Sequence, residues 1–81
     1  MDKSLNMLRE KFGKVLRDLR IESKLSQEKL AELSGLDRTY ISLLERGLRQ
    51  PTITTIFDLS TALNIPASTI IKAVEDSLKD N

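Results

Sequence analysis

The sequence predicts an all-α fold of five helices in one domain, and three observations support this prediction. Apolar residues recur at spacings of three and four, the period of an amphipathic helix. No segment alternates apolar and polar residues at every second position, as a half-buried strand would. Capping and helix-breaking residues separate the apolar stretches. The expected helices span about residues 5–23, 27–34, 38–46, 53–63 and 67–78.

The domain is expected to cover residues 1–81, because a chain of 81 residues is too short for two ordinary domains. The sequence contains no internal repeat, linker or low-complexity tract. A single core of this size buries only about 60% of the surface of the unfolded chain, so we expect modest stability.

The first expected helix carries one apolar stripe that would face the core. Its members are Leu5, Leu8, Phe12, Val15, Leu16 and Leu19. Gly13 interrupts this helix at a cost of about 1 kcal/mol relative to alanine. We expect burial of the stripe to outweigh that cost.

The second and third expected helices are short and are separated by a tight turn. Ser26 can cap the second helix, and Gly35 can end it in a left-handed conformation. Asp37 can cap the third helix, and Gly47 can end it. The residues expected to face the core are Leu30, Ala31, Leu33, Ile41 and Leu44. Those expected on the other side of the third helix are Arg38, Thr39, Ser42 and Arg46.

Capping and helix-breaking residues also indicate where the fourth and fifth expected helices begin or end. Thr52 can cap the fourth helix, Asn64 breaks it, and Pro66 suits the start of the fifth. In the fourth helix we expect inward positions for Ile53, Ile56, Phe57 and Leu59 or Leu63. The fifth helix has a wide apolar stripe that consists of Ala67, Ile70, Ile71, Val74 and Leu78.

The composition argues against several kinds of site. The chain has no cysteine and no histidine, so it lacks disulfides, thiolate or imidazole metal ligands and the usual general bases. It also lacks a glycine-rich phosphate loop. We therefore expect no metal site, no cofactor and no enzymatic activity. Without an apolar span of about 20 residues or a signal peptide, we expect a cytoplasmic protein that does not contact membranes.

The net charge of +1 is too small to indicate a nucleic-acid partner by itself, but the charge is unevenly distributed. Residues 1–25 carry seven basic and four acidic side chains, residues 26–52 carry four of each, and residues 53–81 carry two and four. This gradient is compatible with one basic face, and also with ordinary fluctuation in charge. Aromatic residues make up only 4% of the chain, too few for stacking on single strands, so duplex DNA is the favoured nucleic acid.

The run from Leu25 to Gly47 has the layout of a helix-turn-helix, whose second helix can present polar residues to a DNA groove. Its motifs resemble the Cro and phage-repressor (XRE-like) class of helix-turn-helix domains. The motifs are Ser26-Gln27-Glu28-Lys29-Leu30-Ala31, Leu36-Asp37-Arg38-Thr39-Tyr40-Ile41-Ser42, and Glu45-Arg46-Gly47 followed by Arg49, Pro51 and Thr52. The second motif looks most like the controller proteins of restriction–modification systems. The resemblance covers nearly the whole chain and implies a five-helix, lambda-repressor-like DNA-binding domain.

The resemblance implies that the third helix lies in the major groove of double-stranded DNA. The residues that suit base reading there are Arg38, Thr39, Ser42 and Leu43. The residues that suit contacts with the DNA backbone are Gln27, Tyr40, Arg46, Arg49 and Thr52. Three of these have a second interpretation: Arg38 as a solvated surface arginine, Tyr40 as a packing residue, and Thr52 as a helix cap. Arg20 and Glu45 match a family pair that forms an ion pair between the first and third helices.

A homodimer is expected because one small module contacts too few base pairs to select a genomic site. Two copies would read a pseudo-palindromic operator as two half-sites. The fifth helix supplies a candidate interface, since it has more apolar side chains than one small core requires. The candidate residues are Ile65, Ile70, Ile71, Val74 and Leu78. The alternative is that the whole stripe belongs to the core of a single chain.

The leading hypothesis is therefore a sequence-specific transcriptional regulator, most like a controller protein. In controller proteins, occupancy of one site recruits RNA polymerase and filling of a second site represses, so RNA polymerase is a possible further partner. The alternative is an antitoxin or phage-type repressor whose helix-turn-helix domain also binds a protein partner. Copurification of a stoichiometric partner that blocks homodimerisation would favour this alternative.

Overall fold

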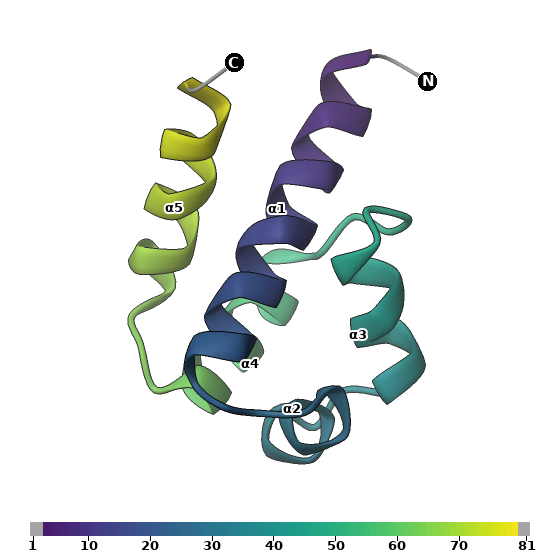
Figure 1. Cartoon of the computed structure of the whole chain (residues 1–81), viewed down its shortest axis with the longest axis vertical. Coiled ribbons are helices and arrows are strands. Elements are labelled where there is room, and N and C mark those ends of the chain that lie inside the picture. Colours follow the sequence, from purple (N-terminus) through teal and green to yellow (C-terminus); the bar gives the residue numbers. More distant parts are fainter. Residues whose placement is uncertain (1–2, 80–81) are drawn as a thin grey trace.

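The computed structural model describes residues 3–79, with the side chains of residues 3 and 5 outside its described part. Within this range the chain forms five helices and no strand, as the sequence predicts (Figure 1). The helices are α1 (Lys3–Glu22), α2 (Gln27–Ser34), α3 (Arg38–Glu45), α4 (Ile53–Leu63) and α5 (Ala67–Lys79). The expected domain limits at residues 1 and 81, and the expected burial of the Leu5 side chain, lie outside the described part.

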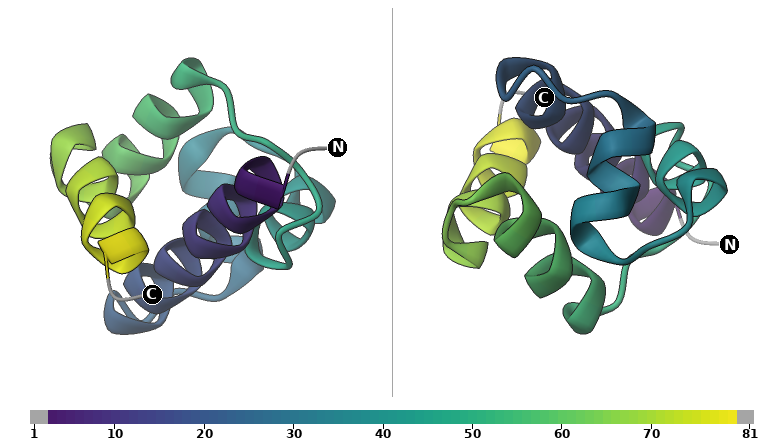
Figure 2. Two further views of the ribbon diagram at one scale, coloured as in Figure 1. Left: turned by 90° about the horizontal axis from the view of Figure 1, so that it is seen from above. Right: turned by 90° about the horizontal axis from the view of Figure 1, so that it is seen from below.

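The long helix α1 organises the molecule. It packs against α3 on one side and against α5 on the other, while α2 packs against α3 and α4, and α4 packs against α5 (Figures 1 and 2). Helices α1 and α5 run in opposite directions (Figure 1). The core between the helices is built from aliphatic side chains and one phenylalanine. Its fully buried members include Leu16, Leu30, Ile41, Leu44, Leu59 and Ile70.

The helix ends confirm most of the expected caps. Ser26 Oγ accepts from the Lys29 N–H at 3.0 Å, and Thr52 Oγ1 accepts from the Thr55 N–H at 3.0 Å. Gly35 follows α2 in the left-handed conformation with φ 75°, and Asn64 does the same after α4 with φ 57°.

The expected cap of α3 is confirmed in position only. Asp37 is the N-cap residue and has an extended backbone, but its side chain makes no capping hydrogen bond. At the other end, α3 stops at Glu45, one residue earlier than expected, and Gly47 takes up a left-handed conformation with φ 74°.

Gly13 has a packing role that the sequence did not indicate. A Cβ atom at this position would lie 2.4 Å from the Leu44 carbonyl oxygen and 2.6 Å from that of Glu45. Only a glycine lets α1 approach the backbone of the last turn of α3 this closely. The residue therefore sets the separation of these two helices.

Three residues that were expected to face the core are instead exposed. Leu33 is 47% exposed, Ile53 is 66% exposed and Phe57 is 57% exposed. On α4 the inward positions between the buried aliphatic residues are occupied by Thr55 and Ser60, which are 6% and 5% exposed. Their hydroxyl groups are hydrogen-bonded within α4 and its cap, so the burial of these two polar residues is tolerated.

None of the described helices combines the length and apolar character that crossing a lipid bilayer requires.

Candidate nucleic-acid interface

Helices α2 and α3 form a helix-turn-helix unit that is joined by residues 35–37. Ile41 and Leu44 anchor α3 in the core with no exposed surface. Because a helix repeats every 3.6 residues, Ser42 and Leu43 lie on the side of α3 away from these two residues. Of the four candidate base-reading residues, Arg38, Thr39, Ser42 and Leu43, the first two are exposed and the last two are half-buried.

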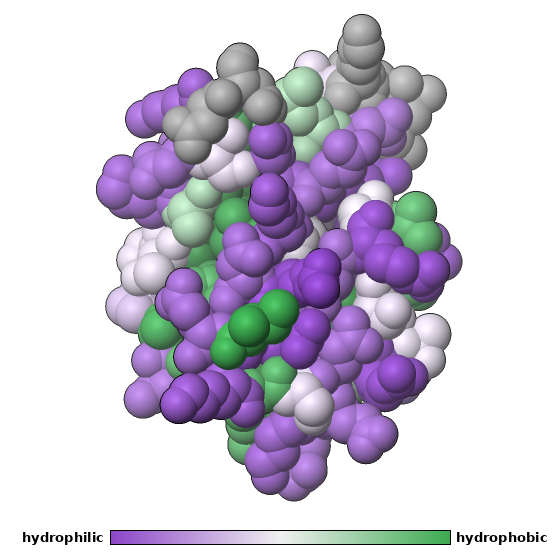
Figure 3. Space-filling view, viewed as in Figure 1, coloured by the Kyte–Doolittle hydropathy of each residue, from purple (hydrophilic) through white to green (hydrophobic). Residues whose placement is uncertain are grey.

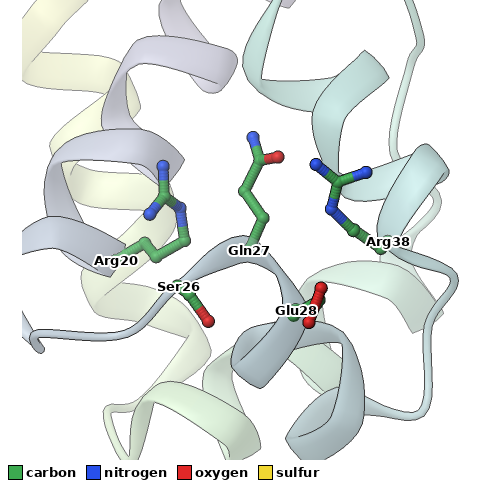
Figure 4. Close-up of a pocket in the computed structure, with 5 residues that line it drawn as sticks. All are labelled: Arg20, Ser26, Gln27, Glu28 and Arg38. Atoms are coloured by element: carbon green, nitrogen blue, oxygen red, sulfur yellow. The ribbon is translucent and has the colours of Figure 1, made fainter.

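A shallow open cleft lies where the C-terminal part of α1 meets the first residues of α2 and α3. It has a volume of about 330 Å³ and is lined by Arg20, Ser26, Gln27, Glu28 and Arg38. Figure 4 shows the Gln27 side chain between the two arginines, with Arg20 on α1 and Arg38 on α3. The cleft therefore places two guanidinium groups and an amide beside the N-terminal end of α2, where the backbone N–H groups favour anions.

Arg20 forms the expected ion pair with Glu45. Arg20 Nε donates to Glu45 Oε2 at 2.6 Å, and Arg20 Nη2 donates to Glu45 Oε1 at 2.9 Å. Arg20 Nη1 also donates to the Leu25 carbonyl oxygen at 2.9 Å, next to the turn that leads into α2. The side chains are only 13% and 4% exposed, and the hydrogen bonding that Arg20 donates to the Glu45 carboxylate raises the pKa of Arg20. This pair is a framework element that joins α1, α3 and the start of α2.

Gln27 is linked to the same carboxylate. Its Nε2 donates to Glu45 Oε1 at 3.1 Å, and the side chain is half-buried. The sequence alone predicts a phosphate contact for Gln27 and a framework role for Glu45, without a connection between them. The structure brings the two residues together although 18 positions separate them.

Tyr40 faces α4. Its hydroxyl lies 3.4 Å from Thr55 Oγ1, which in turn lies 2.9 Å from Thr52 Oγ1. Tyr40 is half-buried and packs partly against the core, which agrees with the packing interpretation. Thr52 serves as the cap of α4 and remains exposed, so the capping role leaves its side chain accessible.

The loop between α3 and α4 carries exposed basic side chains, Arg46 and Arg49. Arg49 Nη1 donates only to the neighbouring Leu48 carbonyl oxygen, at 3.2 Å, among the contacts described. The loop is held on α1, since a Cβ at Gly47 would lie 3.2 Å from Glu10 Cα, and Arg9 Nε donates to Gln50 Oε1 at 3.3 Å. The loop therefore has a fixed position beside the C-terminal end of α3.

Two other exposed residues of this loop were not among the predicted site residues. Leu48 is 50% exposed between the two loop arginines, and Gln50 is exposed and joins the loop to α1. Leu48 could have been identified as a candidate contact residue because it is an apolar residue in a polar loop. No comparable signal existed for Gln50, because its contact with Arg9 depends on how the loop folds back.

The surface also has large exposed apolar side chains on α4 and α5. We define the α4–α5 face by Ile53, Phe57 and Ile71, the last of which is 41% exposed. Beside it lies an apolar cavity of about 130 Å³ that is lined by Leu8, Phe12, Gln50, Pro51, Ile56, Ile71 and Val74. By contrast, the side of the molecule seen in Figure 3 is largely hydrophilic, with hydrophobic side chains in small separate patches.

The candidate dimer residues at and near the fifth helix differ in how far they are buried. Ile70 is fully buried and Val74 is 6% exposed, so both belong to the core of this chain. Ile65 and Leu78 are half-buried and pack against the core, and Ile71 is exposed. Only part of the stripe is therefore accessible to a second copy, and Ile53 and Phe57 were not among the candidates.

Comparisons with known proteins agree with this geometry. The HTH_3 helix-turn-helix family model matches residues 16–70. Control protein C.SmaI of Serratia marcescens is 46% identical over 57 residues, which cover 70% of this chain and 68% of the relative. Control protein C.BamHI of Bacillus amyloliquefaciens is 44% identical over 61 residues, which cover 74% and 75%.

Solved structures of restriction–modification controller proteins have the same fold. The structure of C.AhdI from Aeromonas hydrophila matches with a TM-score of 0.75 and 48% identity, over 76% of this chain and 94% of the other. Wild-type C.Esp1396I matches with a TM-score of 0.80 and 32% identity, over 88% and 93%. The family match spans both helices of the unit and the cleft beside it, and the chain belongs to the HTH_3 helix-turn-helix family.

Proposed function

We propose that this chain is a transcriptional regulator of the controller type that binds a pseudo-palindromic DNA operator as a homodimer. The observation that carries the proposal is the position of the exposed first turn of α3, with Arg38 and Thr39, beside the polar cleft that Gln27 lines at the start of α2. A groove-reading helix needs such a neighbour, because phosphate contacts fix its register while base contacts supply specificity. The relatives named as control proteins support the same assignment.

Base reading is assigned to the outward side of α3. Arg38 can donate two hydrogen bonds to guanine O6 and N7, and the hydroxyls of Thr39 and Ser42 can bond to base edges. Leu43 supplies an apolar surface for a thymine methyl group. These contacts would discriminate between sequences.

Backbone contacts are assigned to the two regions that flank α3. Gln27 would meet a phosphate at the N-terminal end of α2, and Arg46 and Arg49 would meet the backbone from the loop after α3. Thr52 and Tyr40 lie beside this loop and would add hydroxyl contacts. These contacts would hold the protein on any duplex and make affinity depend steeply on salt.

The α4–α5 face is assigned to self-association. Its residues Ile53 and Phe57 are exposed to solvent, whereas Thr55 and Ser60 on the same helix are buried. Exposed large apolar side chains that form a patch are typical of an interaction site, and a self-complementary patch generates a two-fold dimer. Ile65 and Leu78 lie at half-buried positions that could extend the interface.

Such a regulator would act on DNA in the cytoplasm, and we assign no catalytic role to it. The controller hypothesis also includes a contact with RNA polymerase. Acidic side chains near the DNA-facing surface, such as Glu28, would make this contact.

Titration with duplex and single-stranded DNA at several salt concentrations tests the proposal. We expect one dimer per duplex, weak single-strand binding, and log affinity that falls linearly with log salt. Equal affinity for both forms, or a copurifying protein that blocks both dimerisation and DNA binding, would contradict it.

A further inference from the structure

We infer that Glu45 is a positioning residue for DNA binding, because its carboxylate holds the Gln27 amide in the orientation that a phosphate contact requires. The inference rests on the proposed function. Glu45 itself is 4% exposed and lies behind Gln27, so it would not contact DNA. Apart from its part in holding the helices together, its effect on binding would pass through Gln27.

The carboxylate of Glu45 is shared between two partners. Oε2 accepts from Arg20 Nε, and Oε1 accepts both from Arg20 Nη2 at 2.9 Å and from Gln27 Nε2 at 3.1 Å. The Arg20 guanidinium fixes the plane of the carboxylate through two bonds and is itself tied to the Leu25 carbonyl oxygen. Gln27 is therefore attached to an acceptor that has a fixed position.

This attachment determines which way the amide faces. A carboxylate only accepts hydrogen bonds, so it selects the NH₂ group of Gln27 and rejects the flipped orientation, in which two oxygens would meet. The amide has two N–H donors, and the bond to Glu45 uses one. The second N–H remains on the same nitrogen, and it is a donor that a phosphate oxygen can use.

The ion pair also removes an electrostatic obstacle. An unpaired carboxylate this close to the DNA backbone would repel a phosphate, but Arg20 offsets its charge. Loss of the pair would therefore change the behaviour of Gln27 in two ways: the side chain would regain rotamer freedom, and its amide would lose its orientation.

A double-mutant cycle separates this positioning role from a purely structural one. The first background is the wild-type chain, and the second is Arg20→Met with Glu45→Leu, which replaces the pair by apolar side chains of similar volume and leaves no unpaired buried charge. Gln27→Ala is measured in both, on the same operator duplex. We expect it to lower affinity about tenfold per half-site in the wild-type background and about twofold or less in the second.

Arg49→Ala is the matched control, because this exposed arginine lies away from the ion pair and is expected to have the same effect in both backgrounds. An equal effect of Gln27→Ala in the two backgrounds would overturn the inference and leave DNA binding itself intact. A wild-type chain that binds no duplex would instead contradict the proposed function.

A second measurement needs no change in Arg20 or Glu45. NMR relaxation of the two glutamine side-chain amides, Gln27 and Gln50, is recorded for the wild-type protein without DNA. Among the hydrogen bonds described for residues 3–79, Gln50 uses only its oxygen, toward Arg9, so its NH₂ group serves as the reference. We expect an order parameter for Gln27 that approaches the value of about 0.85 found for rigid backbone, and a value below about 0.6 would overturn the inference.

Discussion

Arg20 of α1 and Glu45 of α3 form an ion pair through two hydrogen bonds, with side chains that are only 13% and 4% exposed. Removing one partner of a buried pair leaves the other charge without compensation. We expect Arg20→Ala to lower the free energy of unfolding by about 3–5 kcal/mol, measured by denaturant titration. The Arg20→Met, Glu45→Leu double variant should lose much less. A single variant as stable as the wild type would show that the pair does not hold α1 and α3 together.

Gly13→Ala should destabilise the protein although alanine is the better helix former. On an exposed helix position the change would gain about 1 kcal/mol, but here the new Cβ would meet two backbone carbonyl oxygens of α3 at 2.4 and 2.6 Å. Overpacking of this kind typically costs about 1–3 kcal/mol. Lys14→Ala, at an exposed neighbouring position, is the control in the same thermal or chemical unfolding series. A stability gain in Gly13→Ala would refute the close approach of α1 and α3.

Phe57→Glu should convert the proposed dimer into monomers with little effect on the fold, since Phe57 is 57% exposed in the single chain. Analytical ultracentrifugation measures the change in mass. Affinity for a two-half-site operator should fall sharply, while affinity for an isolated half-site should change little. Leu33→Glu, at an exposed position of α2, is the matched control and should remain dimeric. A dimeric Phe57→Glu variant would exclude the α4–α5 face.

Arg38→Ala and Arg49→Ala should have different effects on DNA binding. Arg38 is assigned to a base, so its loss should relax specificity at one position of the half-site by about 1–3 kcal/mol. Arg49 is assigned to the backbone, so its loss should weaken binding to all sequences evenly and lower the salt slope by about 1 per contact. Binding to a set of single-base operator variants measures both. The same fractional loss on every sequence for both variants would refute the assignment.

The helix boundaries were predictable where a residue at the helix end has a side chain that caps the helix or a backbone that favours the left-handed conformation. The hydroxyls of Ser26 and Thr52 form their caps within a few residues, and Gly35 and Asn64 supply the left-handed residues that end α2 and α4. Such interactions are local in sequence. The ion pair between Arg20 and Glu45 was available only through the family resemblance, since its partners come from different helices.

The orientation of α4 was not predictable for a physical reason. Apolar residues occupy so much of the circumference of α4 that periodicity alone does not select the buried side, and Thr55 and Ser60 can be buried because their hydroxyls bond within the helix and its cap. Ile53 and Phe57 were therefore assigned to the core and are exposed instead. The link between Gln27 and Glu45 also depends on how three helices pack, and no local pattern indicates it.

Selection of bound sequences from a pool of random duplexes assumes neither an operator nor a partner. If α3 reads DNA and two copies bind together, selection will enrich a dyad-symmetric motif whose half-sites lie about one helical turn, roughly 34–36 Å, apart. Recovery of no common motif, or of a single half-site without symmetry, would contradict this mode of binding.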